Sequence, residues 1–257
     1  MASKYNHLQF TLTIPIPHKP HTIMTKKSTT GFTLFESDDI IVVATLKTSN
    51  RKTGNMSQVW ILDPSTDPVQ SVKTGKDAST VCKGCKFASG NGCYVNAGQA
   101  PLQVWKGYHR GIYPMLQPKH YDTVFGDRKV RFGAYGNPSM IPLGIVSAIA
   151  KVSKGWTGYF HDWHMMSAEK AKAYGKYFMA STETESSRCK ASNIGLRYFH
   201  VSPNQPENTI ECLSDTKGIS CADCQLCQGL NKSRLQSVWI NPHGSKVAKA
   251  NAVALSA

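Results

Sequence analysis

Short runs of β-branched and aromatic residues alternate along the chain with apolar stretches of helical spacing. The runs predict strands over residues 39–46, 57–62, 130–135, 156–160, 177–180, 196–201 and 237–241. Helical spacing, N-cap residues and a first-turn proline predict helices over residues 101–111, 141–152, 167–174 and 185–193. From residue 129 onward the two patterns alternate at roughly 20–25 residues per unit, which is typical of parallel strands joined by crossover helices.

The number of predicted strands limits the architecture. The strand before the first cysteine and the five later ones make about six, short of the eight of a full barrel. We therefore expect an α/β fold, either a partial (βα)6-type barrel or an open parallel sheet, with two cysteine-rich metal-binding loops. We expect one domain over residues 36–245, a flexible N-terminal tail over residues 1–35 and a C-terminal tail over residues 246–257. Met24, which opens a more ordinary N-terminal sequence, is a candidate for the true start.

Seven of the eight cysteines fall in two tight groups, within loops over residues 73–95 and 211–229. The first group is Cys82, Cys85 and Cys93, and the second is Cys212, Cys221, Cys224 and Cys227. Thiolates this close together in a chain without a secretory signal are the usual sign of a metal or an iron–sulfur cluster. Both groups are therefore predicted to bind metal.

The spacing of the cysteines does not decide which metal either group binds. In the second group the run Cys-x2-Cys-x2-Cys resembles a ferredoxin pattern with Cys212 as the fourth ligand, although a tetrahedral zinc takes the same four thiolates. In the first group three thiolates leave one position open, as in catalytic sites. The alternative is a closed site whose fourth ligand is a histidine or Cys189, a lone cysteine in a helical stretch that is otherwise expected to be a small buried side chain.

Polar and aromatic residues gather where the predicted strands end. In β/α proteins the loops at the carboxyl ends of the strands form the site, and the first cysteine loop also follows a strand. The candidate catalytic residues are His161, His164, Glu183 and His200, and the candidate substrate-binding residues are Arg131, Tyr135, Asn137 and His243. The alternative is that some of these, such as Asn137 before a proline, only form turns and caps.

The net charge of +14, from 30 Lys and Arg against 16 Asp and Glu, favours an anionic substrate or nucleic acid as the partner. A basic surface kept for solubility is the alternative. No apolar run of about 18 residues is present, so we expect no membrane span and a cytoplasmic protein. The sequence has no Rossmann, P-loop, G-x-S-x-G or HExxH motif, which argues against the corresponding chemistries.

Several stretches carry a resemblance to a family. The segments CKGCKFASGNGCYVNAG, RFGAYGNP, WTGYFHDWH, YFMASTE, LRYFHV and CADCQLC, followed by NPHG, resemble an uncharacterised, mostly bacteriophage-encoded cysteine-rich family over roughly residues 50–244. The resemblance implies a phage origin, and with it the host cytoplasm, but no particular activity.

A second, architectural resemblance concerns activity. A three-cysteine loop after the first strand of a six-unit β/α barrel is similar to the radical S-adenosylmethionine enzymes, although the spacing here is Cys-x2-Cys-x7-Cys where that family usually has Cys-x3-Cys-x2-Cys. The resemblance implies one or two [4Fe–4S] clusters and S-adenosylmethionine as cofactors. It also implies that the second cysteine group holds an auxiliary cluster.

Three hypotheses follow. The leading one is an iron–sulfur enzyme, resembling radical S-adenosylmethionine enzymes, that acts on an anionic substrate such as a nucleotide or nucleic acid. The second is a basic nucleic-acid-binding protein without catalytic activity, stapled by two closed zinc sites. The third is a hydrolase with an open zinc position.

Overall fold

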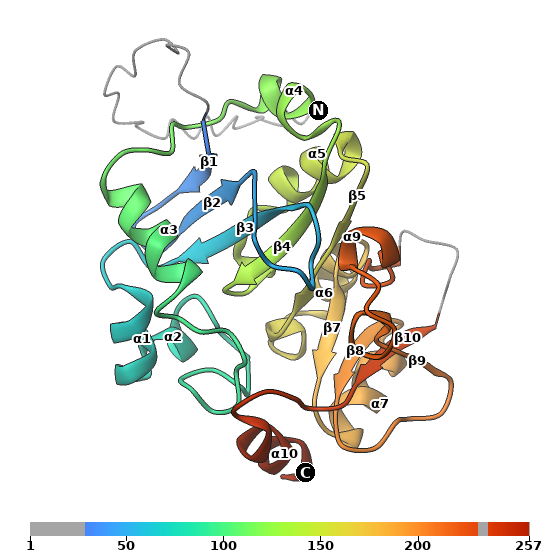
Figure 1. Ribbon diagram of the computed structural model, residues 1–257. Helices are drawn as coiled ribbons and strands as arrows, with labels where there is room; N and C mark the ends of the chain where they lie inside the picture. Colours follow the sequence, from blue (N-terminus) through green and yellow to red (C-terminus); the bar gives the residue numbers. More distant parts are fainter. Residues whose placement is uncertain (1–28, 231–235, 257) are drawn as a thin grey trace, which may run out of the picture.

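The computed structural model describes residues 29–230 and 236–256, and within them the chain forms a mixed α/β fold with two five-stranded sheets (Figure 1). The first sheet has the order β1-β2-β3-β4-β5 and comprises β1 (Gly31–Glu36), β2 (Ile41–Thr45), β3 (Met56–Leu62), β4 (Lys129–Tyr135) and β5 (Gly155–Thr157). The second has the order β6-β7-β8-β10-β9 and comprises β6 (Tyr159–Phe160), β7 (Met179–Thr182), β8 (Tyr198–Val201), β9 (Thr209–Glu211) and β10 (Ser237–Ile240).

Most strand pairs are parallel. β1, β2 and β3 form an antiparallel ribbon at one edge, and every pair from β3 onward runs parallel. The sequence prediction of an α/β fold with mainly parallel strands is therefore confirmed. In the described part of the chain the strands do not close into a barrel.

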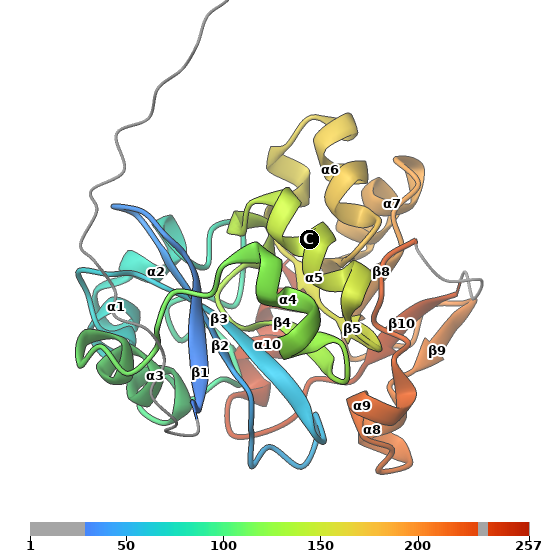
Figure 2. The same cartoon turned by 90° about the horizontal axis from the view of Figure 1, so that it is seen from above.

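Helices connect the parallel strands, as crossover connections require. They are α1 (Pro68–Thr74), α2 (Lys76–Ser79), α3 (Ala100–His109), α4 (Tyr121–Phe125), α5 (Leu143–Val152), α6 (Ala168–Gly175), α7 (Glu185–Asn193), α8 (Leu213–Thr216) and α9 (Cys221–Cys224), with short 3₁₀ turns η1 (Pro118–His120), η2 (Pro138–Met140) and η3 (Asp162–Met165). A further helix, α10 (Val247–Leu255), follows the last strand. Seen from above, α5, α6 and α7 lie along one side of the strands, while α8 and α9 lie on the other side (Figure 2). None of the helices in residues 29–230 and 236–256 is long and apolar enough to cross a membrane.

The two sheets meet at Gly158, the single residue between β5 and β6. A Cβ atom there would lie 2.8 Å from the Phe178 ring and 3.2 Å from the Phe132 carbonyl oxygen, so only glycine fits. The amide of Gly158 donates to the carbonyl of Cys227 rather than to a strand. The break between the sheets is thus also the point where the second cysteine segment docks.

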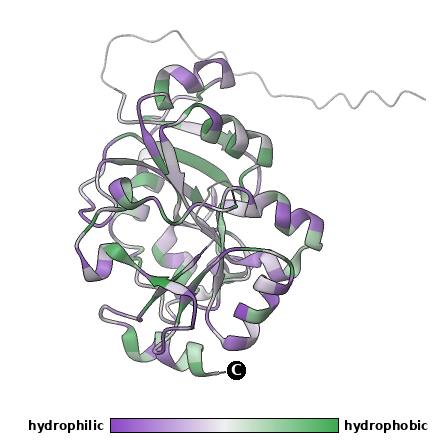
Figure 3. Cartoon of the chain, turned by 90° about the vertical axis from the view of Figure 1, so that its right-hand side faces the viewer, coloured by the Kyte–Doolittle hydropathy of each residue, from purple (hydrophilic) through white to green (hydrophobic). Residues whose placement is uncertain are grey.

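The hydrophobic core follows the strand sequences. β2 (IVVAT) is buried along its whole length, as the β-branched run of a central strand predicts. α5 packs Val146 and Ile149 against the same core. Figure 3 shows the hydrophobic residues concentrated on the strands in the interior.

Helices and strands with a clear period of apolar residues were predicted well, and elements without such a period were missed. The predicted strand over residues 156–160 is split at Gly158, and β1 lies partly within the predicted N-terminal tail, although residues 1–28, including Met24, lie outside the described residues. α10 occupies most of the predicted C-terminal tail. α1 was missed, although Asp67 caps its first turn, Pro68 opens it and Gly75 ends it.

Candidate functional site

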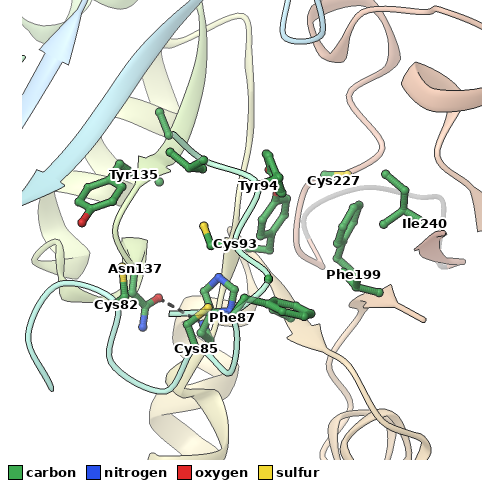
Figure 4. A pocket seen from close by; sticks show the side chains of 18 of the residues that line it. Cys82, Cys85, Phe87, Cys93, Tyr94, Tyr135, Asn137, Phe199, Cys227 and Ile240 are labelled. Atoms are coloured by element: carbon green, nitrogen blue, oxygen red, sulfur yellow. Dashed lines mark hydrogen bonds between the residues drawn. The ribbon is translucent and has the colours of Figure 1, made fainter. Parts of the chain in front are cut away.

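A cavity of about 150 Å³ is lined by residues of both cysteine groups (Figure 4). Cys82, Cys85 and Cys93 contribute from the first group, and Cys212, Cys221 and Cys227 from the second. In Figure 4 the sulfurs of the first group lie on one side of Tyr94, and Cys227, Phe199 and Ile240 lie on the other. Two segments that are more than a hundred residues apart in sequence therefore face one space.

The first cysteine group lies on a tight loop after α2. The amide of Cys85 donates to the carbonyl of Cys82, closing a turn around Gly84, which has φ +78°. A Cβ atom on Gly84 would lie 2.7 Å from the Cα of Asp162, so the turn packs directly against the loop after β6. The Cys-Lys-Gly-Cys sequence is therefore fixed both by its own turn and by a neighbouring strand end.

Backbone amides surround the three sulfurs of this loop. The sulfur of Cys82 accepts from the amide of Gly136, that of Cys85 from the amides of Phe87 and Ala88, and that of Cys93 from the amide of Val95. Burial raises the pKa of all three thiols, so without a cation they are protonated at neutral pH. N–H donors around sulfur stabilise negative charge there and are typical of metal-bound thiolates.

A buried carboxylate holds this loop in place. Asp77 in α2 accepts hydrogen bonds from the amide and hydroxyl of Ser89, at 2.9 and 2.7 Å, and its backbone carbonyl accepts from the amide of Cys82. Asp77 is only 2% exposed. It ties both halves of the loop to α2, a role that nothing in the sequence pattern indicated.

The second cysteine group is packed against the other end of β4. The amide of Cys221 donates to the carbonyl of Lys52 in the β2–β3 loop, and Lys129 at the start of β4 donates to the carbonyl of Ala222 at 2.6 Å. Cys212, Cys221, Cys224 and Cys227 also line a small hollow of about 20 Å³ beside the main cavity. The other three thiols of the group are close enough for each to raise the pKa of Cys227, after the larger effect of burial.

The described side chains do not yet form a finished coordination shell. Within residues 29–230 and 236–256 no three His, Cys, Asp or Glu side chains lie at the mutual spacing of a metal site. The donor set nevertheless fits a thiophilic metal, because each group consists of half-buried cysteine thiols. Loading would require the thiols to turn toward a common centre and lose their protons.

Arg131 extends from β4 toward the middle of the cavity. Its guanidinium donates to the hydroxyls of Tyr159, at 3.0 Å, and Tyr94, at 3.3 Å, and lies 5.6 Å from the centre of the Tyr159 ring. The two hydroxyls are 2.9 Å apart. Phe199 stacks on the Tyr159 ring, with the two ring centres 4.7 Å apart.

Asn137, Tyr135 and His161 line the cavity on the side of the first cysteine group. Fully buried Asn137 donates to the carbonyl of Lys83 and accepts from the amide of His161, so it joins the cysteine loop to the end of β6. Burial lowers the pKa of His161 to about 4, which keeps its imidazole neutral at physiological pH.

Three of the four candidate catalytic residues, Glu183, His200 and His164, lie outside this lining. Glu183 is buried behind Ser181, whose hydroxyl donates to it, and burial raises the pKa of Glu183 to about 7. His200 is buried against the hydroxyl of Thr182, and burial lowers its pKa to about 4. His164 is exposed on η3. Exposed Cys189 on α7 is not among the residues that line the cavity, and the expectation that it is buried was wrong.

The mouth of the cavity carries a small polar cluster. His243, after β10, stacks on Tyr94 with ring centres 6.1 Å apart, and its Nε2 lies 2.8 Å from the Nζ of Lys52. Asp215 in α8 lies 3.4 Å from the same Nζ. Three distant segments thus meet where the cavity opens.

Sequence reasoning missed the residues that complete the cavity. Tyr94, Tyr159, Thr157 and Lys52 all line it, yet none follows a predicted strand end. Tyr94 had one signal, since it directly follows Cys93. Among the other aromatic residues, Trp60 belongs to the hydrophobic core, and Trp105, Tyr108 and Tyr113 pack against it rather than line the cavity.

Comparison with known proteins gives no further guidance: no family model, no curated protein and no solved structure matches the chain.

Proposed function

We propose that the chain is an iron–sulfur enzyme, similar to the radical S-adenosylmethionine enzymes, that acts on an anionic substrate held in the cavity. Cys82, Cys85 and Cys93 would hold the reactive [4Fe–4S] cluster. Cys212, Cys221, Cys224 and Cys227 would hold an auxiliary cluster. The observation that carries the proposal is that thiols of both groups line one cavity.

The parallel strands agree with this proposal. The series β3, β4, β5/β6, β7, β8 and β10 would correspond to the six units of a partial barrel, with the reactive loop following the first of them. Three protein thiolates leave one iron of a [4Fe–4S] cluster open, and with S-adenosylmethionine bound there the cluster would supply one-electron chemistry.

The residues around the cavity have separate tasks in this proposal. With a cluster bound, the amides of Gly136, Phe87 and Val95 would stabilise the negative charge on the cysteine sulfurs that hold it. Arg131 binds the anionic end of the substrate. Neutral His161 can accept a proton at its Nδ1, which has no other partner in the described structure.

The decisive experiment is analysis of iron, zinc and acid-labile sulfide after anaerobic purification, with an absorption spectrum. Brown protein with about four to eight iron atoms and matching sulfide is the expected result. The pairs Cys82→Ala/Cys85→Ala and Cys221→Ala/Cys224→Ala should each remove about half of the iron.

Cys189→Ala is the matched control, because Cys189 is exposed on α7 and does not line the cavity. It should keep the full iron content. The reduced wild type should then cleave S-adenosylmethionine reductively, and the Cys82→Ala/Cys85→Ala variant should not. Colourless protein with one or two zinc ions, or intact clusters without cleavage, would count against the enzyme; zinc would favour the stapled nucleic-acid-binding protein instead.

A further inference from the structure

Buried polar atoms without partners collect around the cavity. In the described residues six buried side-chain oxygen or nitrogen atoms have no hydrogen-bond partner, and three of them belong to cavity residues: Tyr135 Oη, Thr157 Oγ1 and His161 Nδ1. An unpaired buried polar atom costs about 1–3 kcal/mol, so native proteins rarely keep one without a reason. All three residues line one cavity, where a bound polar ligand would supply the missing partners.

The charged side chain in the cavity indicates whether that ligand is positively or negatively charged. No carboxylate in residues 29–230 and 236–256 forms an ion pair with Arg131, whose hydrogen bonds go to two neutral phenols. Thr157 is the register partner of Arg131 on the neighbouring parallel strand, so both side chains line the cavity from adjacent positions. A guanidinium beside an unpaired hydroxyl is suited to a carboxylate or a phosphate group.

The dimensions of the cavity limit the size of the ligand. A cavity of about 150 Å³ is the size of one that takes up a single benzene ring. The stacked rings of Tyr159 and Phe199 and the side chain of Tyr94 provide apolar walls beside Arg131. The enclosed part of such a space holds a single ring and not several consecutive nucleotides.

We propose that Arg131 and Thr157 form an anion-binding subsite for a small organic acid of about single-ring size, whose far end meets Tyr135 and His161. The acid group is a carboxylate or a phosphate monoester. The inference deepens the proposed function, since it names the substrate class of the same cavity and narrows it from nucleic acid to a small molecule.

The competing explanation is that Arg131 only balances the charge of the second cysteine group. Arg131 lies near Cys221 and Cys227 and lowers the pKa of each, against the larger effect of burial. In that case replacing Arg131 would change metal retention but would not change the binding of small anions.

The test compares charged and uncharged molecules of the same shape by calorimetric titration of the full-length protein. The probes are benzoate against benzamide, and phenyl phosphate against phenol, all built on one six-membered ring. The wild type should bind at least one charged member about tenfold more tightly than its uncharged counterpart. The two pairs distinguish a carboxylate ligand from a phosphate ligand.

Three variants locate the subsite. Arg131→Gln should abolish the preference for the charged member, Arg131→Lys should keep part of it, and Thr157→Val should weaken it about threefold to tenfold. Lys154→Gln is the matched control, because it also removes one positive charge but on an exposed residue paired with Asp127. Thermal unfolding of each variant shows whether it is folded. If Arg131→Gln does not fold, Arg131→Lys and Thr157→Val provide the test.

Several outcomes would overturn the inference. These are equal binding of charged and uncharged members, no binding of any of the four probes up to about 10 mM, or an unchanged preference in Arg131→Gln. Binding of a single-stranded oligonucleotide that is tighter than that of all four probes and indifferent to Arg131→Gln would also overturn it. The titration is repeated on chelator-treated protein, so that anion binding is measured separately from metal content. A colourless zinc protein that keeps the preference for charged probes refutes only the iron–sulfur proposal. An iron–sulfur protein that lacks this preference refutes only the subsite.

Discussion

Arg197 shows how a single residue supports the candidate site from outside. It is 4% exposed, and its guanidinium donates to the backbone carbonyls of Leu226, Gln228, Gly229 and Gln236. Three of these carbonyls belong to the segment around Cys227, and the fourth belongs to Gln236, directly before β10. A rigid planar fork is needed to reach four carbonyls at once, and the ammonium of a lysine cannot reproduce it.

Arg197→Lys is therefore expected to destabilise the protein by about 2–4 kcal/mol, because several carbonyls lose charge-assisted hydrogen bonds. Urea unfolding measures this, together with the metal content attributed to the second cysteine group, which should fall. Arg188→Lys is the control, since Arg188 pairs with exposed Glu185 at the surface and should cost less than about 1 kcal/mol. Equal effects of the two substitutions would show that Arg197 has no special role.

At this scale the sequence predicted which residues gather better than it predicted their contacts. Close spacing singled out the seven cysteines, six of which line the cavity. Strand ends singled out Arg131, Tyr135, Asn137 and His161, and these four also line it. The contact between Tyr94 and Tyr159 was not predictable, because it joins residues 65 positions apart that carry no shared motif. The same holds for Asp77, whose role depends on how the loop folds back to Ser89.

At the scale of elements, α10 closes the first cysteine loop. Ala250 and Val253 pack against Phe87 in a small cluster that also contacts Cys85 and Cys93. Figure 1 shows α10 next to the loop that follows α2, although the two are far apart in sequence. The Ala- and Val-rich sequence predicted no more than a tail here, because its apolar side chains gain their stability only from this packing.

Val253→Asp should lift α10 from the loop, since a buried charge at this contact is strongly unfavourable. In reduced, metal-free protein the thiols of Cys85 and Cys93 should then react with a thiol reagent at least about tenfold faster. Mass spectrometry of the labelled peptides measures the rates. Leu255→Asp introduces the same charge on the same helix at a side chain that is 70% exposed, and it should leave the rates unchanged.

Elements with a strong apolar period or a local cap in the sequence were predictable, and short elements were not. α7 begins and ends at the predicted residues because its N-terminal capping box is local in sequence. By contrast β9, α8 and α9 have three or four residues each and no period to detect. Their positions depend on contacts with other segments, such as the bond from the Cys221 amide to the β2–β3 loop.

At the scale of the whole molecule, the two sheets enclose the cavity because the strand series is interrupted. The chain leaves the first sheet at Gly158 and continues in the second, and the opening left beside the break is filled by the segment that carries Cys227. The period of the strands predicted that most of them run parallel, although β1 and β9 were not predicted. It could not predict the break, because the break depends on the packing of Phe132 and Phe178 around one glycine.

Two buried groups outside the cavity make the stability of the molecule depend on pH in opposite directions. The pKa of Glu183 is raised from 4.5 to about 7 by burial, so its contribution to stability is lost as the pH rises through this range. The pKa of His200 is lowered from 6.5 to about 4 by burial, so its contribution is lost as the pH falls from 6.5 to 4. His161 has the same sign as His200, and the two together outweigh Glu183 in mild acid.

His200→Asn tests this balance, because the amide oxygen of asparagine can keep the bond to Thr182 while the titrating ring is removed. The unfolded wild type takes up a proton at position 200 below pH 6.5 that the folded protein excludes, which costs the wild type about 2–3 kcal/mol of unfolding free energy between pH 7 and 4.5. The variant should lose that much less over the same interval, whatever its absolute stability at pH 7. Urea unfolding at five or so pH values measures the two slopes, with His120→Asn as an exposed control that should follow the wild type. Parallel slopes for the wild type and His200→Asn would mean that the folded protein can protonate His200, and that its burial between β7 and β8 is looser than the structure shows.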